Sequence, residues 1–203
     1  MNYPPLVPSP RDEAQFAAIL NASELLLKKQ VIRLLGKKLR ILERGNVVLT
    51  VEQEGLMIKA PIRVFLDEAQ TRPVLGAFTP PQVIGYQPHD IVDLMSNQKI
   101  GVIHKVGNDD FRIYDAWGRE IGELREDSLL LSIMRKVLFN LIPQKYDLKI
   151  AGKKVARYSQ NWNPLTYRLT VRYLVPASQF DRRLGLAAAV MLACLEGRET
   201  SVG

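Results

Sequence analysis

The sequence contains few of the side chains that bind transition metals or form covalent intermediates. Cys194 is the only cysteine among 203 residues, which excludes an intrachain disulfide, and its place in an apolar run indicates a buried thiol. His89 and His104 are the only histidines, and they lack the spacing of paired metal ligands. Glycine-rich phosphate loops and nucleophile elbows are also missing. The sequence therefore predicts a protein that is not an enzyme, with no catalytic residue, cofactor or metal.

Long apolar segments are also scarce, and the length of the longest favours the interior of a protein over a membrane. Leu184–Leu195 carries no polar side chain on any face and is bracketed by charged residues. A helix of that length rises about 18 Å, whereas the hydrocarbon core of a bilayer is about 30 Å thick. A helix that is apolar all round must lie inside a protein or inside a membrane, and this length favours the protein interior. We expect a central helix over residues 181–198, with a buried surface that includes Leu184, Leu186, Ala188, Val190, Met191, Leu192 and Leu195.

The length and the hydrophobic content of 47% fit a single domain preceded by a short extension. Met1–Pro10 is proline-rich and reads as an arm, and the spacing of apolar residues predicts a short helix over Arg11–Ala22. We therefore expect residues 1–22 to form this extension and residues 23–199 to form the domain. The N-terminal residues do not have the pattern of a secretory signal, which makes a cytoplasmic location the expectation.

Apolar and polar residues alternate through several segments joined by short turns, which is the pattern of β-hairpins. The clearest copies read FRIYDAWGREIGEL, DIVDLMSNQKIGVI and YDLKIAGKKVARY. Their turns contain residues that tolerate a positive φ, such as Gly118 and Gly152. The predicted hairpins are Leu39–Val51, Ile62–Phe78, Ile91–Val106, Phe111–Leu124 and Tyr146–Tyr158.

Two more predicted strands, Glu24–Ile32 and Leu165–Val175, raise the count to about a dozen. An antiparallel sheet of that size tends to close on itself, and the interior of such a barrel is too wide for its own side chains to fill. The apolar helix can occupy this interior. The predicted fold is therefore mainly β, a closed antiparallel barrel of about twelve strands around a central hydrophobic C-terminal helix.

Two segments allow a second interpretation. Ser23–Arg44 could be a basic amphipathic helix at a membrane surface, although the alternation of Leu39 and Ile41 favours strands. Ser128–Leu141 has helical spacing of its apolar residues and is followed by Pro143. We expect it to cover one end of the barrel, with a membrane-facing helix as the alternative.

The charge balance is basic, with a net charge of +7 and a pI near 9.6. This favours a partner of negative charge, such as anionic lipid, an acidic protein or, less favoured, nucleic acid; a merely soluble exterior is the alternative. Arg182 and Arg183 are expected to pair with nearby carboxylates or backbone carbonyls. The candidates for holding phosphate or lipid head groups are Lys28, Lys29, Arg33, Lys37, Lys38, Arg40, Lys149, Lys153, Lys154 and Arg157.

Three segments give the chain a resemblance to a known family. They read FRIYDAWGREIGEL, LIPQKYDLKIAGKKVARYSQNWNPLTYRLTV and DRRLGLAAAVMLACLEGRE, and the resemblance covers Glu24 to Arg198. In this order they resemble the phospholipid scramblase and LURP-one-related proteins, which share the tubby-like fold, and a bacterial-type member is expected. The resemblance implies a twelve-stranded barrel around a hydrophobic C-terminal helix.

The functions that the resemblance implies divide within the family. Tubby proteins bind phosphoinositide head groups through basic residues, scramblases move phospholipids in a calcium-dependent way, and LURP-one-related proteins have no settled biochemistry. Val175–Asp181, which stands where scramblases bind calcium, has one carboxylate, so calcium binding is not expected. Our leading hypothesis is a tubby-like barrel that binds anionic phospholipid as a peripheral membrane protein. Scramblase-type lipid transport and a soluble interaction module are the alternatives.

Overall fold

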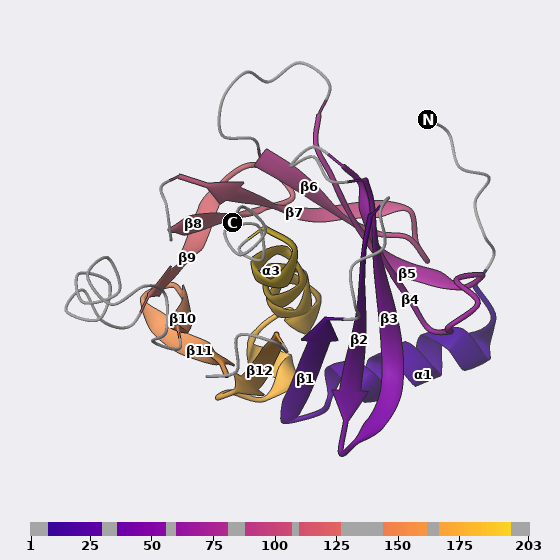
Figure 1. Cartoon of the computed structure of the whole chain (residues 1–203). Coiled ribbons are helices and arrows are strands. Elements are labelled where there is room, and N and C mark those ends of the chain that lie inside the picture. The colour runs from indigo at the N-terminus through magenta and orange to yellow at the C-terminus, as the bar shows by residue number, and fades with distance from the viewer. Residues whose placement is uncertain are drawn as a thin grey trace.

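The computed structural model describes residues 8–29, 36–55, 60–80, 88–106, 110–126, 144–161 and 167–195. In these residues the chain forms a closed antiparallel barrel of twelve strands with a C-terminal helix in its interior (Figure 1). Each strand pairs with its neighbours in sequence, and β1 closes the barrel by pairing with β12. The predicted fold class is confirmed.

The strands are short and regular. Their bounds are β1 Glu24–Lys29, β2 Gly36–Glu43, β3 Asn46–Glu54, β4 Ile62–Phe65, β5 Pro73–Phe78, β6 Pro88–Asp93, β7 Gln98–Lys105, β8 Phe111–Asp115, β9 Glu120–Glu126, β10 Lys145–Ile150, β11 Lys153–Gln160 and β12 Arg168–Tyr173. The helices are α1 Pro10–Leu20, the single-turn 3₁₀ helix η1 Ala177–Gln179 and α3 Arg182–Leu195. The predicted helix over Ser128–Leu141 lies outside the described residues.

The predicted hairpins all occur, with turns where the sequence placed them. They are β2–β3, β4–β5, β6–β7, β8–β9 and β10–β11. Gly118 and Gly152 adopt φ values of 82° and 76°. A side chain is strained in that region of φ, which is why glycine suits these turns. The turns could be predicted from the sequence because each depends on the types of the few consecutive residues that form it.

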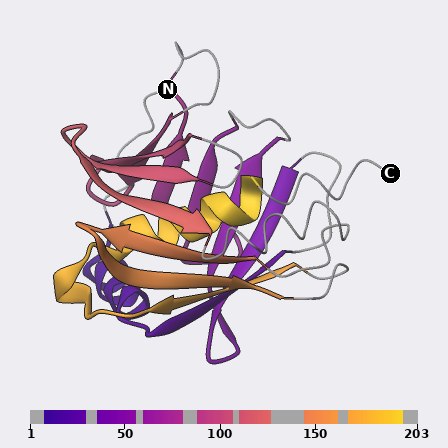
Figure 2. The same ribbon diagram turned by 90° about the vertical axis from the view of Figure 1, so that its left-hand side faces the viewer.

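The helix α3 fills the barrel along its axis (Figure 2). Every residue from Leu184 to Cys194 is buried, which accounts for six of the seven residues predicted to line the helix. The side chain of Leu195 and residues 196–198 lie outside the described part. Inward-facing strand residues such as Leu25, Ile91 and Val171 belong to the same buried cluster as the residues of the helix. Because barrel and helix each expose apolar surface without the other, each stabilises the other.

Polar contacts fix the helix at the end where it begins. Arg182 is 7% exposed, and its guanidinium donates to the carbonyls of Leu20, Ala22 and Val175. Arg183 donates to Asp181 at 2.6 Å and to Asp93 at 2.7 Å. The expectation that these arginines pair with carboxylates or carbonyls is confirmed. They tie α1, β6, β12 and α3 together.

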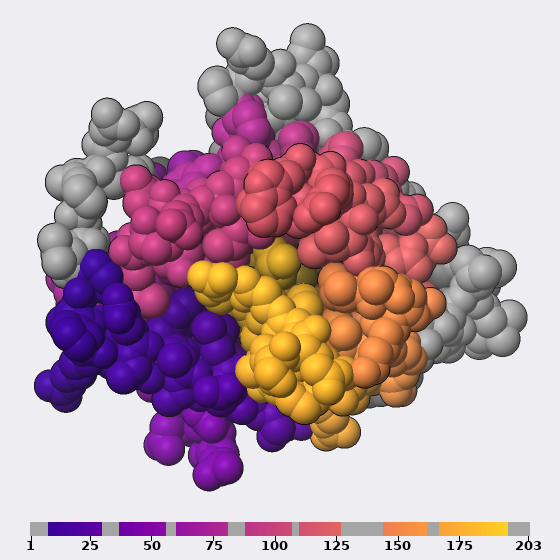
Figure 3. All heavy atoms as spheres, turned by 180° about the vertical axis from the view of Figure 1, so that it is seen from behind, coloured from indigo at the N-terminus to yellow at the C-terminus, as the bar shows by residue number. Residues whose placement is uncertain are grey.

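One end of the barrel carries the turns of the five hairpins, and we call it the turn rim. The five hairpin turns lie there, together with the start of α3, because the strands alternate in direction. Figure 3 shows the start of α3 in the middle of this face (yellow), with α1 (indigo) on one side and the β10–β11 hairpin (orange) on the other. The end where α3 finishes is the opposite rim. This division places the features considered next.

Candidate functional site

The best candidate site lies on the outer face and the turn of the β10–β11 hairpin, and we call it the basic hairpin: Lys149, Lys153, Lys154 and Arg157. Tyr146 and Leu148 on β10 face the interior and are fully buried. Because side chains alternate along a strand, Asp147 and Lys149 face outward. Lys149 lies opposite Lys154 in the strand register, and Asp147 opposite Arg157. The structure therefore brings three of the four cations predicted in this segment onto one face, while Lys153 lies opposite Ile150 at the exposed turn.

A single carboxylate at the centre of the hairpin balances part of this charge. Asp147 is 4% exposed, forms an ion pair with Lys154 and accepts a hydrogen bond of 2.9 Å from Arg157. Glu123 lies opposite Lys149 on the neighbouring strand, but its carboxylate is 3.3 Å from Arg112 and 3.1 Å from Arg125. The charge of the hairpin is therefore only partly compensated.

Lys149 and Lys153 carry the uncompensated charge. Among the described residues, Lys149 forms no ion pair, and the ammonium of Lys153 donates to the neutral amide of Gln179 at 2.9 Å. Like charges opposite each other in a sheet are destabilising, so the Lys149–Lys154 pairing costs stability. An anion that is held between these side chains would relieve that cost. The arrangement suits phosphate, which accepts hydrogen bonds from several donors at once.

The cations predicted in the first strands are distributed differently, and two of them do not belong to the outer surface. Leu39 and Ile41 face the interior, and Lys37 shares their side of β2. Lys37 is 6% exposed, and its ammonium donates to the carbonyl of Cys194 near the end of α3. The interpretation of Lys37 as a surface cation is therefore corrected. Its role is to neutralise the negative end of the helix dipole.

Lys29 follows the same alternation on β1, two residues after the buried Leu27. Burial lowers the pKa of its ammonium, and the nearby Cys194 acts in the opposite direction. Lys29 is thus drawn toward the interior like Lys37. Arg33, the remaining candidate on this side of the chain, lies outside the described residues.

The outward-facing cations of the first strands form a row across three strands. Lys28 on β1 lies opposite Arg40 on β2 and opposite Arg168 on β12, and we call these three residues the first-strand row. Arg40 is 3.1 Å from Glu68, and Lys38 beside it is 3.6 Å from Glu52. The sequence prediction missed Arg168, because only the closure of the barrel places it beside Lys28.

The hairpin next to the basic hairpin carries an exposed tryptophan that the sequence prediction also missed. Trp117 lies in the β8–β9 turn and is 81% exposed. The guanidinium of Arg119 lies 5.4 Å from the centre of the indole ring. An aromatic residue within the turn Asp115–Gly118 is a visible signal, but its exposure follows only from the structure. Strand β9 pairs with β10, so the two hairpins are neighbours.

Asp115 organises this turn. Its carboxylate accepts hydrogen bonds from the backbone N–H groups of Trp117 at 3.0 Å and Arg119 at 2.9 Å, and from the Arg119 guanidinium at 2.7 Å. Burial by itself raises the pKa of Asp115, but these hydrogen bonds outweigh it and hold the pKa below its usual value. The turn is therefore held by Asp115, and the indole ring is not needed for its shape.

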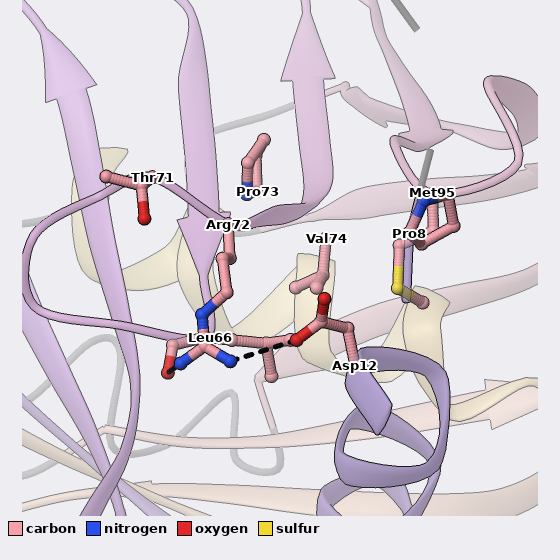
Figure 4. Close-up of a pocket in the computed structure, with 8 residues that line it drawn as sticks. All are labelled: Pro8, Asp12, Leu66, Thr71, Arg72, Pro73, Val74 and Met95. Atoms are coloured by element: carbon pink, nitrogen blue, oxygen red, sulfur yellow. Dashed lines mark hydrogen bonds and ion pairs between the residues drawn. The ribbon is translucent and has the colours of Figure 1, made fainter. Parts of the chain in front are cut away.

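A small cavity lies at the turn rim between α1 and the β4–β5 turn (Figure 4). It holds about 160 Å³ and is lined by Pro8, Asp12, Leu66, Thr71, Arg72, Pro73, Val74 and Met95. Arg72 donates to Asp12 at 2.9 Å, so the two charged residues of the cavity lining are paired with each other. Asp12 also belongs to the capping box that starts α1 with Ser9. The cavity therefore reads as the junction that anchors α1 to the barrel.

The two histidines of the chain lie on neighbouring strands. His89 is 1% exposed on β6, and His104 is half-buried on β7. Within the described ranges, no three His, Cys, Asp or Glu side chains are grouped so that they could hold a metal ion. None of the helices in these ranges combines the length and the apolar character needed to span a membrane.

Comparisons of the chain with protein-family models, with curated proteins and with solved structures found no match. The functional argument therefore rests on the geometry of the two neighbouring hairpins.

Proposed function

We propose that this chain is a non-enzymatic barrel protein of the tubby-like type that binds anionic phospholipid head groups as a peripheral membrane protein. The observation that carries the proposal is the basic hairpin, where Lys149, Lys154 and Arg157 share one outward face with one carboxylate and Lys153 lies at the exposed turn beside them. Lys149 and Lys153 have their charge available, and the turn rim places them at an end of the molecule. The fold supplies the rigid frame, and the hairpin supplies the charge.

The energetics of this surface suit reversible attachment. A lysine or arginine near an anionic membrane contributes about 1 kcal/mol. Lys149 and Lys153 together therefore contribute about 2 kcal/mol, which is roughly a 30-fold increase in affinity. Because the Debye length falls from about 10 Å at 0.1 M salt to about 3 Å at 1 M, binding should weaken strongly at high salt.

Scramblase-type lipid transport is less well supported. It requires α3 to leave the barrel, and α3 is held at both ends by buried hydrogen bonds. Arg182 donates to three carbonyls at the start of the helix, Tyr158 donates to the carbonyl of Gly185 at 3.0 Å, and Lys37 donates to the carbonyl of Cys194. Breaking these contacts and exposing an apolar helix costs far more than the surface charges supply.

Vesicle flotation tests the proposal. The purified chain should float with phosphatidylcholine vesicles that contain phosphatidylserine, should stay at the bottom with phosphatidylcholine alone, and should float less at 1 M salt, roughly a 3 Å Debye length. The variant K149Q/K153Q should bind more weakly while it unfolds at the same denaturant concentration as the parent. Failure of the parent chain to float with the anionic vesicles at low salt would overturn the proposal.

A further inference from the structure

Trp117 is the most exposed of the large hydrophobic side chains in the described residues. Its exposed fraction is 81%, against 41% to 47% for Val47, Val106 and Leu174. Leaving an indole in water forgoes a large gain from burial. The ring is not required by the turn either, since Asp115 and the backbone hold the turn closed. The position of Trp117 therefore needs an explanation outside the folded monomer.

The other exposed apolar residues are not scattered evenly over the molecule. Val47 follows the β2–β3 turn and Leu174 follows β12, so both lie at the turn rim with Trp117, whereas Val106 lies at the opposite rim. Each of the three at the turn rim has an exposed cation within three residues along the chain. These cations are Arg44 beside Val47, Arg119 beside Trp117 and Arg172 beside Leu174.

Exposed apolar side chains and cations at the same end of a molecule suit contact with a lipid surface. Tryptophan prefers the zone between lipid head groups and acyl chains, where the ring is buried and its N–H remains hydrogen-bonded. Arginine extends its apolar stem along such a surface and keeps its charge at the phosphates. A protein partner, by contrast, calls for one contiguous apolar patch, and here the side chains are spread around the rim. A lipid surface can contact apolar side chains that lie apart from one another.

The neighbouring elements supply the matching charge. Strand β9 of the tryptophan hairpin pairs with β10 of the basic hairpin, and the backbone N–H of Ala151 in the second turn donates to the carbonyl of Ile121 at 2.9 Å. Leu174 donates its N–H to the carbonyl of Val155 on β11 at 2.9 Å. Trp117, Lys153 and Leu174 therefore occupy one sector of the turn rim, over three consecutive connections of the barrel.

We propose that Trp117 inserts into the interfacial zone of an anionic bilayer, so that the barrel docks with its turn rim toward the lipid. The proposal rests on the proposed function, because the basic hairpin beside Trp117 makes the head-group contacts. It adds an orientation and a second kind of contact. The opposite rim, where α3 ends, then points away from the membrane. Attachment becomes partly hydrophobic and should survive salt better than charge alone allows.

Tryptophan fluorescence gives a direct test, because the chain has two tryptophans, at positions 117 and 162. In the background W162F, Trp117 is the only indole. When phosphatidylcholine vesicles containing phosphatidylserine are added, its emission should move to shorter wavelengths, and brominated lipid should quench it. The variant W117A should bind these vesicles roughly tenfold more weakly, since an aromatic contact is lost. V106A removes a similarly exposed apolar side chain at the opposite rim and should bind like the parent.

The outcomes separate this inference from the proposed function. If the parent chain does not bind the anionic vesicles, both fail. If the parent binds but Trp117 emission does not change, or if W117A binds as well as the parent, head-group binding stands and the insertion of Trp117 is overturned. If W117A and V106A weaken binding equally, the inferred orientation is overturned. Because Trp117 is 81% exposed, its replacement should leave the free energy of unfolding unchanged, which denaturant titration checks.

Discussion

Strands β1–β2 and the β10–β11 hairpin are both rich in lysine and arginine, yet they use these cations differently. On β1 and β2, Lys29 and Lys37 fall on the side of the buried leucines, and Lys37 serves the end of α3. On β10 and β11, Lys149 and Lys154 fall on the outer side, opposite each other. The local density of positive charge is similar in the two regions. What differs is the side of the strand on which each cation lies. A cation on the same side as the buried apolar residues stabilises the fold, whereas one on the other side can face a partner.

The largest effect that follows from this comparison concerns Lys37. In K37E a carboxylate would be buried at the negative end of α3, so we expect a loss of about 3–5 kcal/mol in the free energy of unfolding. The neighbouring variant K38E changes an outward cation that is part of a half-exposed ion pair, and it should cost about 1 kcal/mol or less. Urea titration followed by circular dichroism measures both. Equal losses would show that Lys37 does not have the interior role described for it.

A second prediction compares the two outer surfaces with variants of equal charge. K149Q/K153Q and K28Q/R168Q each lower the formal net charge from +7 to +5. The first pair should weaken binding to anionic vesicles by roughly 30-fold, about 1 kcal/mol per cation, and the second pair only by the small effect of net charge. Vesicle sedimentation over a range of lipid concentrations gives the affinities. The reverse ranking would move the lipid-binding surface to the first-strand row.

The smallest effect should be a gain. Replacing Asp147 by asparagine removes the carboxylate that compensates Lys154 and Arg157, so D147N should tighten binding to anionic vesicles by roughly fivefold, or about 1 kcal/mol. E68Q makes the same change beside Arg40 on the other side of the barrel and should leave the affinity near that of the parent. Both variants raise the net charge by the same amount. An equal gain in both would indicate that total charge, and not the hairpin, sets the affinity.

Much of the fold follows from the sequence because its signals are local. The turns at Gly118 and Gly152 and the alternation of apolar residues predict hairpins without any knowledge of their neighbours. The apolar run that begins at Leu184 predicts an enclosed helix, because its length favours the protein interior over a membrane span. Counting strands then predicts closure, since so large an antiparallel sheet rarely stays open.

The site was less predictable, for two different reasons. Lys37 was grouped with its neighbours by charge, although the period of two set by Leu39 and Ile41 already placed it inside; the signal was present and was outweighed by the basic composition of the segment. Arg168 could not have been found in this way. Its place beside Lys28 depends on the pairing of β1 with β12, which only the closed barrel brings together. The exposure of Trp117 likewise depends on how far its turn stands clear of the packed strands.

Closure through β1 and β12 also has a consequence for the order in which the chain folds. Glu24 pairs with Arg172, and the helix that fills the interior follows β12 in the sequence. During synthesis on the ribosome, we expect the hairpins to form first, while one edge of β1 stays unpaired until β12 has been made. Pairings of such high sequence separation fold slowly, and unpaired edges are prone to aggregation in the meantime. A nascent chain stalled before Arg182 would hold all twelve strands of the barrel but not the helix that fills it, so the barrel can be completed only after α3 has been made.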